Sequence, residues 1–252
     1  MVRKIAVPIV AMVIFLAIWE ALVWVAGWPN YIMASPSDLP AAYARFWDLF
    51  LIMGWQTLWR TVLGLLLAIA FGVFLGMIMG FSRTMRDALY PLLVGFNAIP
   101  KATVVPIVAL LFVGAHDFNT VLIAFMISFF PIAVSVSIGL STLEPEYRDI
   151  LRSLGASQST IFWKIALPKT LPEFFGALKV AVTLAFIGTN LMEIVSPHGR
   201  GLGALFDSGK TNSDYPLMFA VLIALAALGI VLYYVVVALE KVFAGWAERQ
   251  PH

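Results

Sequence analysis

The sequence predicts an all-α membrane protein with six transmembrane helices and both termini in the cytoplasm. Of its 252 residues, 62% are hydrophobic and 12% are charged, whereas soluble domains carry about 45–50% apolar and about 25% charged residues. The mean hydropathy is +0.95. This composition excludes a water-soluble globule and a disordered chain. The near balance of 16 basic and 14 acidic residues argues against a nucleic-acid-binding protein.

The residue types that build most metal and redox sites are scarce. The chain has no cysteine, which excludes disulfides, thiolate nucleophiles, iron–sulfur clusters and cysteine zinc sites. Its three histidines, His116, His198 and His252, are too far apart for a local metal-binding motif. We therefore expect no metal and no cofactor in this chain.

Six stretches are long and apolar enough to be spans, because about 20 such residues cross a hydrocarbon core about 30 Å thick. Three of them hold long charge-free stretches, at Thr61–Ser82, Phe118–Leu143 and Tyr215–Leu239, and the other three are interrupted by one or two charged residues. The first follows Arg3 and Lys4 and is longer than the apolar region of a signal peptide, so we expect it to be retained. Within a single domain, 1–252, the spans cover about 5–26, 57–82, 88–115, 118–143, 174–195 and 215–239.

The basic residues orient the spans, because lysine and arginine concentrate on the cytoplasmic side. With a cytoplasmic N-terminus, most of them fall on the inner side. These are Arg3, Lys4, Arg83, Arg86, Arg148, Arg152, Lys164, Lys169, Lys241 and Arg249. The outer side holds Arg45, Arg60, Arg200 and Lys210.

The segments outside the spans are short. Residues 29–55 form an outer segment in which Ser35–Asp38 resembles a helix start, followed by a short helix through Trp47. Residues 196–214 are rich in Gly, Ser and Asn and are expected to be an outer loop. The only sizeable inner segment is 144–172.

The second span carries small residues at every fourth position. Small side chains at this spacing let two helices approach closely within a membrane. The stripe therefore predicts a close helix contact, either within the chain or with a second copy of it. It consists of Gly64, Ala68, Gly72, Gly76 and Gly80.

The third span is interrupted by Pro91, Pro100 and Pro106, with Lys101 near its middle. Proline removes a helix hydrogen bond, and a lysine in mid-bilayer costs several kcal/mol unless it faces water or a partner. One reading is a broken helix that lines a cavity; the other is a lysine that snorkels from a helix starting near it. For the translocation path the candidates are Pro100, Lys101 and Glu193.

Three further charges lie closer to span ends, where snorkelling costs little. They are Glu20, Lys179 and Glu193. For these we favour snorkelling over a functional role.

The inner segment 144–172 reads as two short helices joined at a glycine. Pro145 suits the first turn of a helix, and Gly155 is a natural stop. Ser157 can cap a second helix over 158–166, which Pro168 would end. Both helices are amphipathic, so either the bilayer surface or the groove of a partner protein could cover their apolar faces.

This segment resembles the signature loop of the permease subunits of ATP-binding-cassette importers, which reads E-A-A-x3-G-x9-I-x-L-P. Gly155 and Ile165–Pro168 reproduce its second half, whereas Asp149–Leu151 keeps only the acid of the first. Ala98–Lys101 with Pro106, and Arg200–Gly203, resemble the nitrate/sulfonate/taurine branch. The resemblance covers nearly the whole chain and implies the type I, MetI-like permease fold.

The resemblance also implies partners. Two permease subunits would form the path as a homodimer in the bacterial cytoplasmic (inner) membrane. A cytoplasmic ATPase dimer, which holds the ATP and magnesium, would dock on the signature loop, and an extracytoplasmic binding protein would deliver the solute. The coupling residues would be Asp149, Gly155, Ile165, Leu167 and Pro168.

The chain itself is not expected to be an enzyme. Gly203–Thr211 only approximates a phosphate-binding loop, since it has one residue too many and no preceding strand. The predicted function is import of a small polar solute such as a sulfonate, taurine or nitrate. The main alternative is a secondary transporter with Glu20, Lys101 or Glu193 in an ion relay; a membrane scaffold would leave the broken span unexplained.

Overall fold

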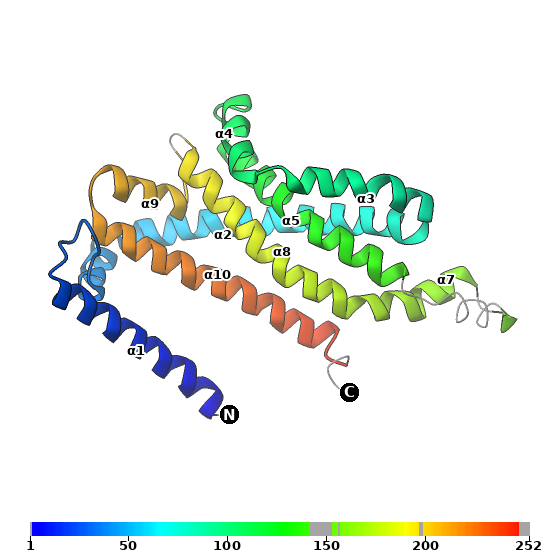
Figure 1. Cartoon of the computed structure of the whole chain (residues 1–252), viewed down its shortest axis with the longest axis horizontal. Coiled ribbons are helices and arrows are strands. Elements are labelled where there is room, and N and C mark those ends of the chain that lie inside the picture. The colour runs from blue at the N-terminus through cyan, green and yellow to red at the C-terminus, as the bar shows by residue number, and fades with distance from the viewer. Residues whose placement is uncertain (1, 142–152, 156, 197–198, 247–252) are drawn as a thin grey trace.

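The computed structural model describes residues 2–141, 153–155, 157–196 and 199–246, and within them all regular structure is helical. Four long helices run side by side along the long axis of the molecule (Figure 1). They are α2 (Leu39–Phe81), α5 (His116–Ser141), α8 (Leu167–Val195) and α10 (Tyr215–Phe243). Their buried side chains form the main apolar core of the bundle.

Shorter helices lie at the two ends and on the flanks of this bundle. They are α1 (Val2–Ala26), η1 (Pro36–Asp38), α3 (Arg83–Ala98), α4 (Lys101–Leu111), α7 (Gln158–Ile161), the π-helix η2 (Phe162–Ala166) and α9 (Leu202–Thr211). The end that carries α9 and η1 is called the outer end, following the predicted orientation, and the end that carries Gly155 the inner end.

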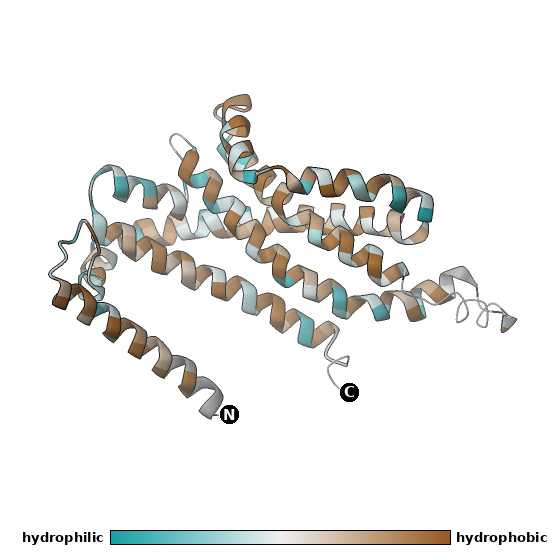
Figure 2. Cartoon of the chain, viewed as in Figure 1, coloured by the Kyte–Doolittle hydropathy of each residue, from teal (hydrophilic) through white to brown (hydrophobic). Residues whose placement is uncertain are grey.

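The apolar surface agrees with a membrane protein. Apolar positions extend along α1, α2 and α10, whereas hydrophilic positions gather at α9 and at the turn between α2 and α3 (Figure 2). Among the described residues, four helices are long and apolar enough to cross a membrane, or five if α3 and α4 together count as one bent span. The total of six spans and the cytoplasmic termini stay predictions.

The small-residue stripe of α2 lies against α5. A Cβ atom added at Gly64 would lie 2.5 Å from the Cβ of Ala124, and one at Gly76 would lie 2.6 Å from the Cβ of Val136. Gly72 and Gly80 face α5 in the same way, and Ala68 is fully buried. The two helices run in the same direction. The side chains of α5 lie so close to α2 that these α2 positions admit only a hydrogen atom or a methyl group.

The third span, 88–115, is broken, as one reading of the sequence predicts. α3 and α4 meet at an angle of 84°, at the extended residues Ile99 and Pro100. Proline has no N–H to continue the helix, and the residue before it is pushed toward an extended conformation.

One expected element differs from the structure at the outer end. The expected outer loop 196–214 contains α9, whose residues Leu202 and Leu205 are buried, so tertiary packing stabilises helix beyond what the local sequence indicates. The short helix predicted to end near Trp47 is present: α2 begins at Leu39, and a kink at Phe46 (φ −118°, ψ 21°) separates its first turns from the span.

Helix α1 lies apart from the bundle over most of its length (Figure 1). It is joined to the rest at its outer end. There the carboxylate of Glu20 accepts hydrogen bonds from the backbone and hydroxyl of Ser37 at 3.0 and 2.9 Å, and Trp19 packs on Phe219 of α10.

Candidate functional site

The inner segment 144–172, called the coupling segment after its predicted role, turns at Gly155. This residue has φ of +80°, in the left-handed region that glycine adopts without a steric penalty. The hydroxyl of Ser157 then accepts a hydrogen bond from the backbone N–H of Thr160 at 3.2 Å, which caps α7. Asp149, together with the rest of 142–152, lies outside the described residues.

The helix after this cap does not end at Pro168, and the predicted stop is wrong. α7 continues through the π-helix η2 into α8, with Pro168 in the first turn of α8. The N–H of Leu167 bonds to the carbonyl of Phe162, five residues earlier. This widened turn accommodates a proline whose ring would clash in a regular α-helix. The coupling segment is therefore fused directly to a membrane-spanning helix.

The apolar side chains of this segment divide into two groups. Ile161 is buried, and Phe162 and Leu167 line an apolar cavity of about 170 Å³ between α2, α5 and α8. Ile165 is half-buried. In contrast, Leu154 and Trp163 are 78% and 63% exposed. The second group forms an apolar surface on the inner end that the described residues leave exposed.

Lys101 lies at the break in the third span. Its Nζ donates to the carbonyls of Phe96, Asn97 and Ile99 at 2.9, 2.9 and 3.1 Å. These carbonyls lie at and just after the C-terminus of α3, where a positive charge is also favoured. Both readings of the sequence therefore describe part of the structure: the helix is broken, and a new one starts at the lysine.

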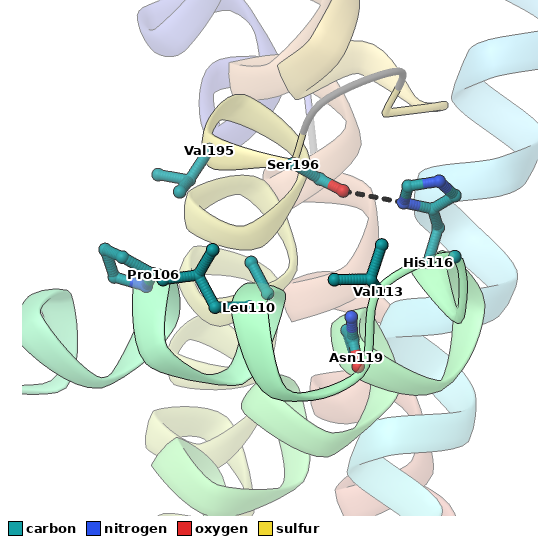
Figure 3. A pocket seen from close by; sticks show the side chains of 9 residues that line it. Pro106, Leu110, Val113, His116, Asn119, Val195 and Ser196 are labelled. Carbon is teal, nitrogen blue, oxygen red and sulfur yellow. Dashed lines mark hydrogen bonds between the residues drawn. The ribbon is translucent and has the colours of Figure 1, made fainter.

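A cavity of about 510 Å³ lies against the second half of this broken span (Figure 3). Its walls are mostly apolar side chains of α4 and the following turn. His116 and Asn119 of α5 and Ser196 after α8 supply the polar groups, and His116 and Ser196 are 2.8 Å apart in a hydrogen bond. Pro106 lines this cavity, whereas Pro100 and Lys101 do not.

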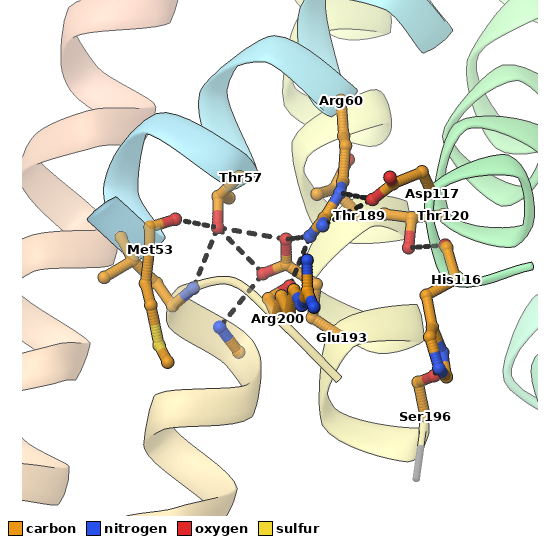
Figure 4. Close-up of polar contacts among 12 residues, drawn as sticks. Met53, Thr57, Arg60, His116, Asp117, Thr120, Thr189, Glu193, Ser196 and Arg200 are labelled. Atoms are coloured by element: carbon orange, nitrogen blue, oxygen red, sulfur yellow. Dashed lines mark hydrogen bonds and ion pairs between the residues drawn. The ribbon is translucent and has the colours of Figure 1, made fainter. Parts of the chain in front are cut away.

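At the outer end, a cluster of polar side chains surrounds Glu193 (Figure 4). Glu193 and Arg60 are 1% and 2% exposed and form an ion pair at 3.2 Å. Arg60 also binds Asp117 of α5 at 2.5 Å and donates to the backbone carbonyl of Arg200. The hydroxyl of Thr57 donates to the Glu193 carboxylate at 2.8 Å. We call Thr57, Arg60, Asp117 and Glu193 the outer cluster.

The outer cluster also caps α9. The residue before this helix, Gly201, has no side chain that could accept its free N–H groups. Instead, Thr57 accepts from the N–H of Leu202 at 2.9 Å and Glu193 accepts from that of Gly203 at 3.0 Å. Gly201 has φ of +122°, and a Cβ there would overlap the Glu193 carboxyl group. The Arg200–Gly203 motif is thus shaped to receive this carboxylate.

This arrangement corrects the expectation for the charges near span ends. Glu193 does not snorkel, because it is buried and paired. Lys179 pairs with Glu240 of α10 at 2.9 Å, and Glu20 binds Ser37. The phosphate-loop-like stretch is the helix α9, and its N-terminus holds a carboxylate of the same chain rather than a free anion site.

The sequence reasoning missed Arg60, Thr57 and Asp117. Arg60 was assigned to the outer side and not to a site. The available signal was its position directly before a long apolar run, because an arginine that enters the membrane normally has an acidic partner. Glu193 was a candidate for that partner.

Comparisons with known proteins decide the family. Residues 68–245 match the family described as "Binding-protein-dependent transport system inner membrane component". The chain belongs to this family. It is 30% identical to the formylaminopyrimidine transport permease protein ThiX of Halalkalibacterium halodurans, over 96% of each chain. It is 25% identical to the taurine transport system permease protein TauC of Escherichia coli, over 97% of this chain and 90% of TauC.

The fold of this permease has also been observed in a solved structure. A chain of the MetNI methionine ABC transporter in an inward-facing conformation superimposes with a TM-score of 0.65. The two share 18% sequence identity, and the match covers 79% of this permease and 98% of that chain. The predicted MetI-like fold, the importer permease family and its taurine and nitrate branch are therefore confirmed. The permease is a multi-pass inner-membrane protein.

Proposed function

We propose that this permease is the transmembrane subunit of an ATP-driven, binding-protein-dependent importer of a small polar solute. The observation that carries the proposal is the continuity of α7, η2 and α8. A push on the inner surface of this segment acts directly on a helix that crosses the membrane, without an intervening loop. The names of the relatives, which transport a pyrimidine or taurine, support a small solute.

The motor is a cytoplasmic ATPase dimer that docks on the coupling segment. The exposed Leu154 and Trp163 supply apolar contacts of the kind that anchor a helix in a partner's groove. Gly155 sets the angle between the two arms of the segment, and Ile165, Leu167 and Pro168 fix the second arm to α8. Asp149 precedes Gly155 in the sequence and lies outside the described residues. ATP and magnesium bind to that partner and not to this chain.

The path for the solute forms between two copies of the permease, and an extracytoplasmic binding protein delivers the solute to the outer end. Two features support this arrangement. The broken third span leaves α4 projecting from the bundle with exposed apolar side chains (Figure 1), and the cavity beside it carries His116, Asn119 and Ser196 at one edge. The candidates for the path are still Pro100, Lys101 and Glu193. Pro100 and Lys101 would act by setting the bend between α3 and α4.

The test is reconstitution in vesicles. The permease is purified with its ATPase and binding protein, and uptake of radiolabelled taurine and of a formylaminopyrimidine is measured. Uptake of one of these solutes should require ATP on the side of the membrane that carries the ATPase. It should also require the binding protein on the opposite side. A permease that accumulates solute alone, driven by a proton or sodium gradient, would instead be a secondary transporter, and the proposal would be wrong.

A further inference from the structure

Helix α8 joins the coupling segment to the outer cluster without a break. It begins directly after η2, and Glu193 lies in its last turn. A helix of 29 residues that rises 1.5 Å per residue is about 43 Å long. This length matches a whole bilayer with its headgroups, about 40–45 Å. α8 therefore reaches from one face of the membrane to the other.

The outer end of α8 is fixed to its neighbours through Glu193. The carboxylate binds Thr57 and Arg60 of α2 and the N–H of Gly203 in α9. Arg60 extends the contact to Asp117 of α5. A buried polar group that loses a hydrogen-bond partner costs free energy, so α9 cannot easily move away from the Glu193 carboxylate that accepts from its Gly203 N–H.

Helix α9 and the end of α8 form a polar hollow on the outer surface. The hollow has a volume of about 340 Å³, and its walls include Ser196, Asp207, Thr211 and Asn212. Ser208 also lines the hollow, and Lys210 is exposed on the same helix. Hydroxyl, amide and carboxylate groups of this kind suit a water-soluble protein surface and not lipid tails.

We propose that Glu193 and Arg60 are positioning residues that attach α9 to α8, so that movement of the coupling segment reaches the outer surface where the binding protein docks. This inference rests on the proposed function. Because coupling between two sites is reciprocal, docking of the binding protein at α9 changes ATP hydrolysis through the same helix.

The absence of cysteine allows the inference to be tested with single spin labels. One label is attached at Lys210→Cys on α9 and another, in a separate preparation, at Lys164→Cys on η2. Both are measured in the assembled complex with ATP and with ADP. We expect both labels to change their mobility with the nucleotide. In the Glu193→Gln background, the label at 164 should still respond and the response at 210 should be lost.

Glu240→Gln is the matched control. It removes the ion pair between α8 and α10 but leaves the outer cluster intact, so both labels should respond as before. Thr57→Val is a milder test variant. It removes one hydroxyl that bridges Glu193 and Leu202 without leaving a charge unpaired, and should weaken the response at 210 even if Glu193→Gln does not assemble.

A second measurement is the stimulation of ATP hydrolysis by the binding protein. The rate of ATP hydrolysis with the binding protein, divided by the basal rate without it, should fall about fivefold or more in Glu193→Gln. The same ratio should stay unchanged in Glu240→Gln. A label at 210 that responds normally in both outer-cluster variants would overturn the inference. If the label at 164 does not respond to ATP in the otherwise unchanged complex, the proposed function itself fails.

Discussion

At the scale of single residues, the permease uses charged side chains to complete backbone hydrogen bonding at helix ends. Lys101 serves three carbonyls at the end of α3, and Glu193 serves an N–H at the start of α9. At both places a helix ends or begins within or near the membrane, where water is not available to solvate free backbone groups. A charge that looks misplaced in the sequence is thus used where a helix is interrupted.

A first prediction concerns Lys101. Lys101→Ala removes the donor from the C-terminus of α3, which should lower stability by about 1–2 kcal/mol and reduce uptake because the 84° bend is less firmly held. Lys101→Arg keeps the positive charge and should retain most of the uptake. Thermal unfolding and vesicle uptake measure the two effects.

The two measurements separate the roles of Lys101. If uptake by the assembled Lys101→Ala complex equals that of the unchanged protein, the lysine caps α3 and takes no part in transport. Lower uptake with assembly intact supports a role for the bend in the solute path.

At the scale of elements, the contact between α2 and α5 depends on residues with small side chains. Inside a membrane, water does not drive two apolar helices together, so their contact depends on close packing. The glycines of α2 provide it, with α5 side chains occupying the space that a Cβ would need.

A second prediction therefore concerns Gly76. Gly76→Leu places its Cβ 2.6 Å from that of Val136 and 2.8 Å from the carbonyl of Ala133. Overpacking of this kind should destabilise the permease by about 1–3 kcal/mol, measured as a lower unfolding temperature in detergent. Gly54→Leu in the same helix is the control, because a Cβ at Gly54 meets no atom within 4 Å. Equal unfolding temperatures for the two variants would contradict the close contact.

At the scale of the whole molecule, the two ends of the bundle carry the two proposed interfaces. The inner end presents Leu154 and Trp163 beside Gly155, and the outer end presents α9. The long helices between them are packed together by the main core.

A third prediction tests the inner interface through Gly155. A leucine at φ of +80° costs roughly 1–2 kcal/mol, although a Cβ there meets no atom within 4 Å. Gly155→Leu should therefore change the angle of the coupling segment and reduce the solute transported per ATP hydrolysed. Gly155→Asn is the control, since asparagine tolerates this conformation and should keep coupling. Normal transport per ATP in Gly155→Leu would exclude the hinge role.

The amino-acid sequence was sufficient to predict the membrane class, the apolar helices, the turn at Gly155 and the family. These follow from composition, from the lengths of apolar stretches and from a motif whose residues are close together in the chain. It also indicated that the third span is broken, because proline disrupts a helix locally.

Which side chains contact one another became evident from the folded structure. Arg60 and Glu193 are paired through helices far apart in the chain, and α9 is capped by side chains of α2 and α8. A local pattern contains no information on such pairings. For the same reason the sequence placed a helix end at Pro168, where a π turn lets the coupling segment continue into α8. The partner of a buried charge is set by packing, which the order of residues specifies only through the whole fold.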